Sequence, residues 1–358
     1  MSKSTDRAAE SKSLVVTAKD AVFVGLDVHK KNVHAAVRLN GREVTTFVMP
    51  ADVATVVRSL SRFRVALKRI VYEAGPTGFG LARALREAEL PTEVVAPGKT
   101  PRPANPDGKS DRLDCRKLAE FAEKGLLKPV AVPTEEEEAD RQVMRLRDQL
   151  IKKRRRVKQQ IKGMLLEYGI PEPSGLKHWT EAGVAALSEL KLRPQIRLAL
   201  GCLVAELKQL MMLLQRARTG MKRLSRQARF REKERRLRTH PGIGETAAMA
   251  YLAEVYQPER FEDAKALTKY VGLAPRVSQS GQRRCEGPLM KTGHGVLRAL
   301  LVEAAWMWIT KDEHAAAVFE RLARNTGSKQ KAIVAMARRI AVNLWCMLLR
   351  QEDYRQAA

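Results

Sequence analysis

The sequence predicts an α/β domain first, then a long helical coiled-coil segment, and then a mainly helical C-terminal domain. Three observations predict this order. Between residues 21 and 133, short β-branched runs alternate with amphipathic stretches. Residues 134–238 hold long patterns of helical period, and residues 239–358 hold shorter helices separated by turns. Residues 1–20 are rich in serine, lysine and aspartate, and we expect them to be disordered.

The first domain is expected to contain a hairpin-built sheet. The expected strands are residues 22–28, 33–39, 44–49, 69–73 and 92–96, and the expected helices are residues 52–63, 80–89 and 111–124. Asn40-Gly41 is a hairpin turn signal between the second and third strands. The order βββαβαβα is that of the ribonuclease-H-like fold, which gathers carboxylates from its first strand, its fourth strand and a late helix.

Four acidic residues fall on those three elements. Asp27 and Glu73 follow β-branched runs, so each is expected at the end of a strand. Asp111 and Asp114 begin a helical pattern three residues apart, so they share one helix face. Asp27 and Glu73 alone are each also compatible with an ordinary strand-end turn. Together they supply the hard oxygen ligands that two divalent cations about 4 Å apart require, so we expect a nuclease-like metal site.

The charge of the chain predicts a polyanionic partner. Lys and Arg total 66 against 40 Asp and Glu, which gives a net charge of +26. Nucleic acid is the commonest partner for such a protein, and a membrane surface is the alternative. The sequence shows no run of 18 apolar residues and no secretory signal, so we expect no membrane-spanning segment. Its four cysteines are far apart, which favours a reducing cytosol over a disulfide framework.

Much of this positive charge lies in the helical segment. A helix is expected from Thr134 to about residue 168, and a second over residues 190–238 with breaks near Pro194 and Gly220. The first carries a heptad-like apolar stripe made of Leu146, Leu150, Val157, Ile161 and Leu165. Residues 141–170 hold ten basic and two acidic residues, and residues 216–239 hold eleven and two. A solvated coiled-coil face is one explanation, but the one-sided charge favours nucleic-acid binding.

The C-terminal domain contains two further candidate sites. The sequence Pro-Gly-Ile-Gly at residues 241–244 resembles a helix-hairpin-helix turn, whose backbone N–H groups approach phosphates. Residues 274–284 are expected to form a polar loop that contains Ser278 and Ser280 as candidate nucleophiles. Five cationic or ionisable residues surround them in sequence, namely Arg276, Arg283, Arg284, Lys291 and His294. Cys285 is a weaker candidate, and docking of a DNA backbone is the simpler explanation of this loop.

These motifs occur together in the order of a known family. They are Gly25-Leu-Asp27-Val-His-Lys, Tyr72-Glu73-Ala-Gly, Ser110-Asp111-Arg-Leu-Asp114, Pro241-Gly-Ile-Gly244 and Gly272-Leu-Ala-Pro-Arg276 followed by Ser280-Gly281. Over residues 21–345 the chain resembles the insertion-sequence transposases that join an Asp-Glu-Asp-Asp domain to a C-terminal serine domain, the bridge-RNA-guided recombinases. Each motif is moderately specific, and the ordered set is highly specific.

The resemblance implies a complete mechanism. A RuvC-like domain would bind Mg²⁺, as one or two ions, through Asp27, Glu73, Asp111 and Asp114. Ser280, with Ser278 as the second choice, would attack a DNA phosphate and form a phosphoserine link. An element-encoded guide RNA would pair with donor and target DNA. The long helices would join protomers into dimers or tetramers, and the acidic domain of one protomer would meet the serine domain of another.

Two other functions remain compatible with the same residues. A Holliday-junction-resolvase-like nuclease would use the acidic site with water as the nucleophile and without a covalent link to protein. A non-catalytic nucleic-acid-binding protein of the same fold would use neither site. We expect a bacterial cytosolic, nucleoid-associated protein in each case.

Overall fold

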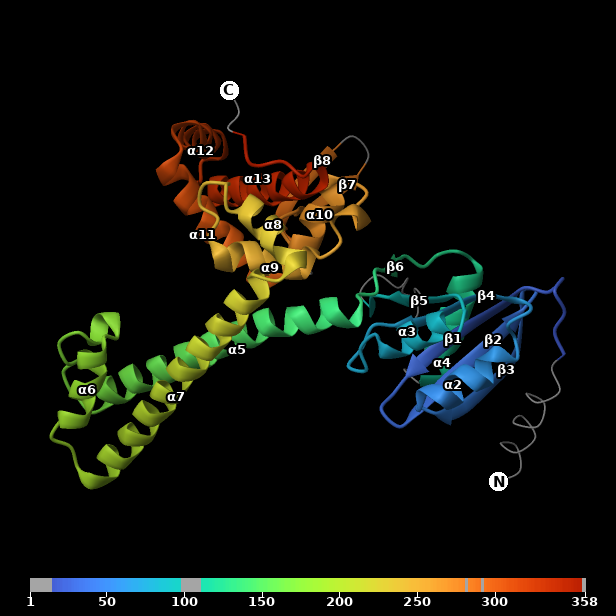
Figure 1. The fold of residues 1–358 in the computed structure, drawn as a ribbon, viewed down its shortest axis with the longest axis horizontal. Helices are drawn as coiled ribbons and strands as arrows, with labels where there is room; N and C mark the ends of the chain where they lie inside the picture. Colours follow the sequence, from blue (N-terminus) through green and yellow to red (C-terminus); the bar gives the residue numbers. More distant parts are fainter. Residues whose placement is uncertain (1–14, 98–110, 281–282, 291–292, 356–358) are drawn as a thin grey trace. The chain divides into compact units, whose positions relative to one another are not determined.

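The computed structural model describes residues 15–97, 111–280, 283–290 and 293–355, with the backbone alone at 111–113, 277–280 and 283–286. The chain divides into two compact units, Met1–Glu136 and Glu137–Ala358 (Figure 1). The predicted finer division of the second unit at residue 238 stays a prediction. Most of the expected extension, residues 1–20, lies outside the described residues. Asp20, at its end, accepts a hydrogen bond from the Asn40 side chain at 2.8 Å.

The first unit contains one mixed six-stranded sheet in the order β3-β2-β1-β4-β5-β6. Its strands are β1 (Val22–Val28), β2 (Asn32–Leu39), β3 (Arg42–Pro50), β4 (Leu67–Glu73), β5 (Thr92–Val95) and β6 (Pro129–Val130). The first three strands are antiparallel neighbours, and β4 runs parallel to both β1 and β5. The sheet is consistent with the expected ribonuclease-H-like domain, and β6 is an edge strand that the sequence pattern did not predict.

Helices cover both faces of this sheet (Figure 1). On one face, α2 (Val53–Ser61) and α3 (Gly80–Glu87) pack on the side chains of Val22, Val24 and Leu26 of β1. On the other face lies α4 (Asp111–Glu123), whose Ala119 packs on the sheet together with Cys115. The alternation of β1 side chains between two helical layers explains why the strand is apolar from Val22 to Leu26.

The second unit begins with a helical hairpin. The helices α5 (Glu135–Glu167) and α7 (Pro194–Ser225) lie side by side, and a short helix α6 (Glu181–Glu189) lies at the far end of the pair (Figure 1). The α5 stripe residues Leu150, Val157, Ile161 and Leu165 are buried in one core with α7 residues such as Leu207 and Leu214. The stripe is therefore used within the chain. Leu146 was predicted wrongly as a member, because its side chain is 49% exposed.

The rest of the second unit is a helical bundle around a large apolar core. Its helices are α8 (Ala228–Leu237), α9 (Glu245–Val255), α10 (Ala264–Val271), α11 (Gly295–Lys311), α12 (Glu313–Thr326) and α13 (Lys329–Arg350). The last of these, α13, contributes nine buried residues to the bundle, including Ile340 and Leu344. Between α10 and α11 the chain forms an antiparallel hairpin of β7 (Pro275–Ser280) and β8 (Arg283–Leu289).

Three local predictions for the second unit are wrong. The expected loop at residues 274–284 is mostly the β7–β8 hairpin, in which Ser278, Gln279 and Ser280 pair with Cys285, Arg284 and Arg283. The predicted break at Gly220 is absent from α7, which continues to Ser225 because a lone glycine costs a helix only about 1 kcal/mol. Helices α6 and α12 were not predicted, although Thr180 and Asp312 cap them in the usual way.

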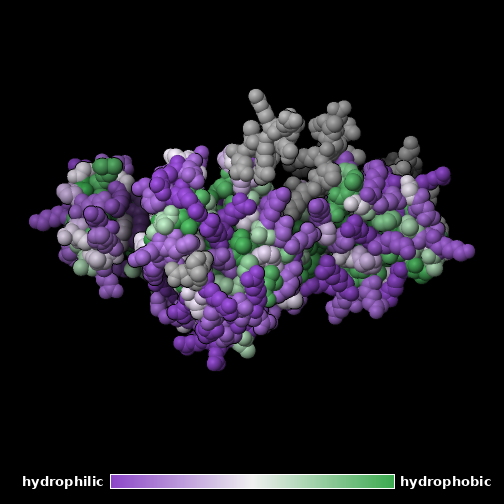
Figure 2. Space-filling view, turned by 90° about the horizontal axis from the view of Figure 1, so that it is seen from above, coloured by the Kyte–Doolittle hydropathy of each residue, from purple (hydrophilic) through white to green (hydrophobic). Residues whose placement is uncertain are grey.

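Two helices are long and apolar enough to cross a membrane by length and composition, namely α7 and α13. In the most apolar 18-residue stretch of each helix, 28% is buried inside the structure for α7 and 50% for α13. Core helices of ordinary globular proteins pass the same test, so this is weak evidence for a span. On the face shown in Figure 2, hydrophilic residues predominate and hydrophobic residues form small groups between them.

Candidate active site

The sheet brings two of the predicted acidic residues to adjacent strand ends. Strands β1 and β4 are parallel neighbours in which Leu26 is paired with Tyr72. Asp27 and Glu73 each follow these paired residues by one position, so they stand side by side at the carboxyl ends of the two strands. Carboxyl ends of parallel strands are where α/β proteins commonly place their ligands.

Both residues lie on the face that α4 covers. Residues two apart on a strand share a face, and Gly25 of β1 is in direct contact with α4. A Cβ atom on Gly25 would lie 2.1 Å from the Cys115 carbonyl oxygen and 2.4 Å from the Ala119 nitrogen. Likewise, Val71 of β4 packs in a cluster with Leu118 of α4. Asp27 and Glu73, two residues further on, are therefore on the same face of the sheet.

The direction of α4 places its first turn beside these carboxylates. Glu123, at the end of α4, pairs with Arg38 at 2.6 Å, and Arg38 stands opposite Phe23 near the start of β1. The helix thus runs antiparallel to β1, and its N-terminus lies toward the end of β1 that holds Asp27. Asp111 is the first residue of α4 and Asp114 is in its first turn. The fold therefore collects the predicted acidic residues at one end of the sheet.

Two histidines and one cysteine surround Asp27. The His29 Nε2 atom is 3.1 Å from the Asp27 carboxylate, and His34 stands directly opposite Asp27 on β2. The two imidazole rings meet edge to face at 5.9 Å. Burial, together with the negative charge of Asp27, raises the pKa of the Cys115 thiol to about 11. Cys115 is therefore a neutral packing residue between α4 and the sheet.

The donor set has the chemistry that a magnesium ion prefers, since it consists of carboxylates. Among the residues whose side chains are described, however, no three acidic, histidine or cysteine side chains converge closely enough to hold a metal. The Asp111 side chain lies outside the described residues, so this statement does not cover the full group of four. The assignment of Asp27, Glu73, Asp111 and Asp114 as metal ligands stays a prediction.

The predicted nucleophiles lie on β7 in the second unit. Ser280 is the last residue of β7 and pairs with Arg283 of β8; residues 281–282 between them lie outside the described residues. Ser278 pairs with Cys285 inside the hairpin. The side chains of these four residues lie outside the description, as does Lys291. The choice between Ser280 and Ser278 therefore stays a prediction.

A buried polar cluster at the base of this hairpin was not predicted. Glu254 of α9 is 3% exposed, and its Oε1 atom lies 3.2 Å from His294 Nε2 and 3.4 Å from Arg145 Nε. Burial opposes ionisation of Glu254, but His294 and Arg145 outweigh it and hold its pKa below the ordinary value. The His294 Nδ1 atom accepts a hydrogen bond from the Leu297 N–H at the start of α11.

Because both ring nitrogens of His294 are used within the protein, its role here is structural. A contact of His294 with a phosphate would require breaking one of these bonds. No sequence signal could have found this cluster, because Arg145, Glu254 and His294 are far apart in the chain and meet only through the packing of α5, α9 and α11.

The turn at residues 241–244 joins α8 to α9. Gly242 has a φ of +91°, and a Cβ atom there would lie 2.4 Å from the carbonyl oxygen of Ala304 in α11. This glycine is therefore required for packing. Gly244 has open space around its Cα atom and caps α9 without a side-chain bond. Binding of phosphate by this turn stays a prediction.

Comparison with known proteins places these features in a class. Residues 234–320 match the family described as "Transposase IS116/IS110/IS902 family", and residues 24–170 match the DEDD transposases of IS110 type. The transposase for insertion sequence element IS1111A of Coxiella burnetii is 26% identical over 346 residues, which cover 95% of this chain and 93% of that protein. The y4qE protein of Sinorhizobium fredii, also named as a transposase, is 30% identical over 292 residues, which cover 80% of this chain and 71% of that protein.

A further relative is the transposase for insertion sequence element IS1533 of Leptospira borgpetersenii, 26% identical over 295 residues, which cover 80% of this chain and 85% of that protein. The matches define the class of insertion-sequence transposases. The chain belongs to the IS110/IS116 transposase family, with a DEDD domain at its N-terminus and the family's second transposase domain toward its C-terminus. Membership implies an enzyme that binds, cuts and recombines DNA, and a DEDD domain implies use of a divalent metal.

Proposed function

We propose that this transposase transfers DNA strands through a covalent phosphoserine intermediate, with an acidic Mg²⁺ site and an element-encoded guide RNA. The observation that supports the metal site is the placement of Asp27, Glu73 and the first turn of α4 toward the same end of the sheet. In this proposal Asp27, Glu73, Asp111 and Asp114 hold the metal. When bound, Mg²⁺ would offset negative charge on the reacting phosphate.

The residues around the metal ligands have positioning roles in this proposal. His29 contacts one carboxylate oxygen of Asp27 at 3.1 Å and would orient it, as histidines and carboxylates next to metal ligands commonly do. Gly25 lets α4 approach β1 closely enough for Asp114 to lie on the same side of the sheet as Asp27. A larger residue at position 25 would move Asp111 and Asp114 on α4 away from Asp27 and Glu73 on the strands.

The Ser280 hydroxyl oxygen would attack the DNA phosphorus and lose its proton to solvent or a nearby base. The bond from phosphorus to one bridging oxygen would break, and that oxygen would take up a proton and leave as a DNA hydroxyl. A second DNA hydroxyl would then displace Ser280. Each step exchanges one phosphodiester bond for another, so no external energy source is needed. The acidic residues lie in the first unit and Ser280 in the second, so the reaction requires both units.

The basic helices supply the proposed grip on RNA and DNA backbones. Residues 141–170 carry a net charge of +8 and residues 216–239 a net charge of +9. In α5, Lys152, Lys153, Arg155 and Arg156 are exposed, and the apolar stripe on the same helix is buried against α7. The cationic face is therefore open to a polyanion. A dimer or tetramer would need other apolar side chains for its contact, such as Leu166, which is 83% exposed.

A trapping assay tests the proposal. The protein, its flanking non-coding RNA, Mg²⁺, and labelled donor and target DNA are mixed and separated on a denaturing gel. We expect a protein–DNA adduct that disappears in Ser280→Ala and persists in Ser278→Ala. Asp27→Asn should abolish the adduct while leaving RNA binding intact, because the acidic residue is proposed to act only in the reaction. Omission of the RNA should leave the adduct undetectable on cognate DNA.

The assay also separates the alternatives. Cleaved DNA without an adduct, still formed by Ser280→Ala, would establish a hydrolytic resolvase-like nuclease. DNA binding without cleavage by the unaltered protein would establish a non-catalytic binding protein. Either result would overturn the proposed serine mechanism.

A further inference from the structure

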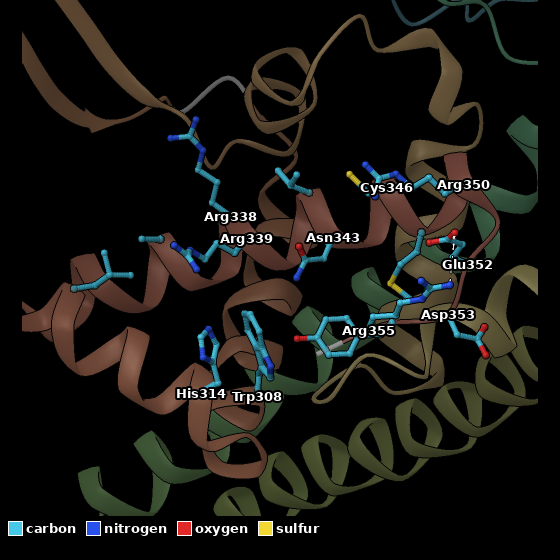
Figure 3. Close-up of a pocket in the computed structure, with 15 residues that line it drawn as sticks. Trp308, His314, Arg338, Arg339, Asn343, Cys346, Arg350, Glu352, Asp353 and Arg355 are labelled. Carbon is cyan, nitrogen blue, oxygen red and sulfur yellow. Dashed lines mark ion pairs between the residues drawn. The ribbon is translucent and has the colours of Figure 1, made fainter. Parts of the chain in front are cut away.

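A cavity of about 740 Å³ lies in the C-terminal bundle, away from the residues assigned above. Its described lining comes from α11, α12, α13 and residues 352–355 at the C-terminal end of the chain. Figure 3 shows Arg338 and Arg339 at one end of this stretch of α13 and Arg350 at the other, with Cys346 between them. We call this surface the α13 groove and define it by Arg338, Arg339, Asn343, Cys346 and Arg350.

The three arginines of the α13 groove are exposed, and none has an acidic partner among the described residues. Within the described part of the chain, Arg338, Arg339 and Arg350 make no ion pair with a carboxylate. Two acidic residues also line the cavity, and each is paired with another arginine. Glu352 is 3.8 Å from Arg355, and Asp353 accepts two hydrogen bonds from Arg235 at 2.9 and 3.1 Å. The remaining charge of the groove is positive.

The spacing of these arginines favours an extended anion over a small one. Positions 339, 343, 346 and 350 repeat every three or four residues, so they form one face of α13. At ~1.5 Å per residue, Arg339 and Arg350 are separated by roughly 16 Å along the helix axis. A nucleic-acid strand presents one phosphate about every 3.4 Å of axis. The two ends of the groove would therefore contact different phosphates of one strand, whereas a free phosphate would reach only one end.

Contacts within the protein hold the side chains beside the α13 groove. The Asn343 side chain lies 3.4 Å from the buried ring of His240, which holds the floor. The Tyr354 N–H donates to Thr239 Oγ1 at 2.8 Å, and its ring packs on His240 at 4.3 Å. Since this ring is already stacked within the protein, the groove offers arginines rather than aromatic faces. Such a surface recognises a backbone and not a base sequence.

We propose that the α13 groove binds the sugar–phosphate backbone of a nucleic-acid strand, independently of sequence. The inference rests on the proposed function only in taking nucleic acid as the partner. It adds a binding site on described residues that belong neither to the acidic site nor to the β7–β8 hairpin. RNA and DNA share the chemistry that the groove recognises, and the experiment distinguishes them.

The first test measures the salt dependence of binding. Fluorescence anisotropy with labelled single-stranded RNA and DNA of increasing length would compare the unaltered protein, the variant R338Q/R339Q/R350Q, and the control R321Q. Arg321 is an exposed α12 arginine that does not line the cavity. The plot of log K against log salt falls with a slope of about −0.7 per phosphate contact for a single strand, so each lost contact makes it less steep by about 0.7. We expect the triple variant to lose about 2 from this slope and the control to lose nothing.

The nucleic acid with the larger loss is the one that occupies the groove. The loss should appear only with strands long enough to span both ends, and inorganic phosphate should not compete. A triple variant that behaves like Arg321→Gln on both RNA and DNA would overturn the proposal. So would equal competition by inorganic phosphate.

A second test needs no arginine variant. Cys346 lies in the groove, and the exposed Cys202 on α7 provides an internal reference for the reagent. Saturating oligonucleotide should slow alkylation of Cys346 by at least tenfold, read from its peptide by mass spectrometry. Unchanged alkylation, or equal protection by polyglutamate, would overturn the proposal. The variant Ser280→Ala should keep this protection, so a failed serine mechanism and a failed groove give different results.

Discussion

Acidification should destabilise the second unit through one histidine. His240 is 1% exposed, its Nδ1 atom donates to the Pro241 carbonyl at 2.8 Å, and its Nε2 atom faces Asn343. The rings of Trp308 and Tyr354 pack on it at 4.8 and 4.3 Å. Burial lowers the pKa of His240 from 6.5 to about 4, because the charged imidazolium loses the solvation that water would give it.

The direction of the effect follows from proton binding. In the unfolded chain His240 takes up a proton as the pH falls below 6.5, while in the folded chain it remains neutral until about pH 4. The unfolded state therefore binds more protons in this window, and stability is fully present above pH 6.5 and is lost as the pH falls toward 4. The difference between the two pKa values corresponds to about 3 kcal/mol.

Tryptophan fluorescence can follow this unit alone. All four tryptophans, Trp179, Trp306, Trp308 and Trp345, lie in residues 137–358. We would measure urea unfolding of the full chain between pH 7 and pH 4 for the unaltered protein and for His240→Gln, which does not titrate. The stability advantage of the unaltered protein should shrink by about 3 kcal/mol across this range. Parallel curves for the two proteins would refute the reasoning, since titration of every other group is common to both.

Two further predictions concern packing of the sites. Gly25→Ala should lower the free energy of unfolding by about 1–3 kcal/mol, because the added Cβ would force α4 away from β1. The measurement is the alkylation rate of the buried Cys115, which should rise. The control Gly80→Ala, where a Cβ meets open space, should leave Cys115 protected. Glu254→Gln removes the charge that holds His294, so it should cost about 1–3 kcal/mol in urea unfolding; an unchanged midpoint would show that the cluster contributes nothing.

The first unit was largely predictable because its signals are local. Strong β-branched runs and the Asn40-Gly41 turn define β1 to β3, and Asp27 and Glu73 directly follow the runs that form β1 and β4. Once the parallel pairing of β1 and β4 is given, the two carboxylates must be neighbours. The helix beginning at Asp111 was equally clear from its apolar spacing. What could not be predicted is how closely α4 approaches, which depends on the absence of a side chain at Gly25.

The second unit was less predictable because its decisive contacts join distant segments. The β7–β8 hairpin is short and contains glycine and proline, so its pattern is that of a loop until the two strands pair. The heptad-like stripe on α5 was visible, but its partner was not. The sequence pattern alone does not distinguish a stripe that packs against α7 of the same chain from one that packs on another protomer.

The base of the β7–β8 hairpin shows why distant contacts matter for the proposed reaction. Gly272, just before the hairpin, and Gly293, just after it, are in backbone contact, since a Cβ on Gly293 would lie 2.1 Å from the Gly272 Cα atom. Arg298 donates to the Gly272 carbonyl at 3.1 Å, and His294 is fixed to Glu254. Both ends of the hairpin are thereby anchored to the bundle. A nucleophile at its tip would be positioned by these contacts, so variants at its base should alter the rate of adduct formation without touching DNA.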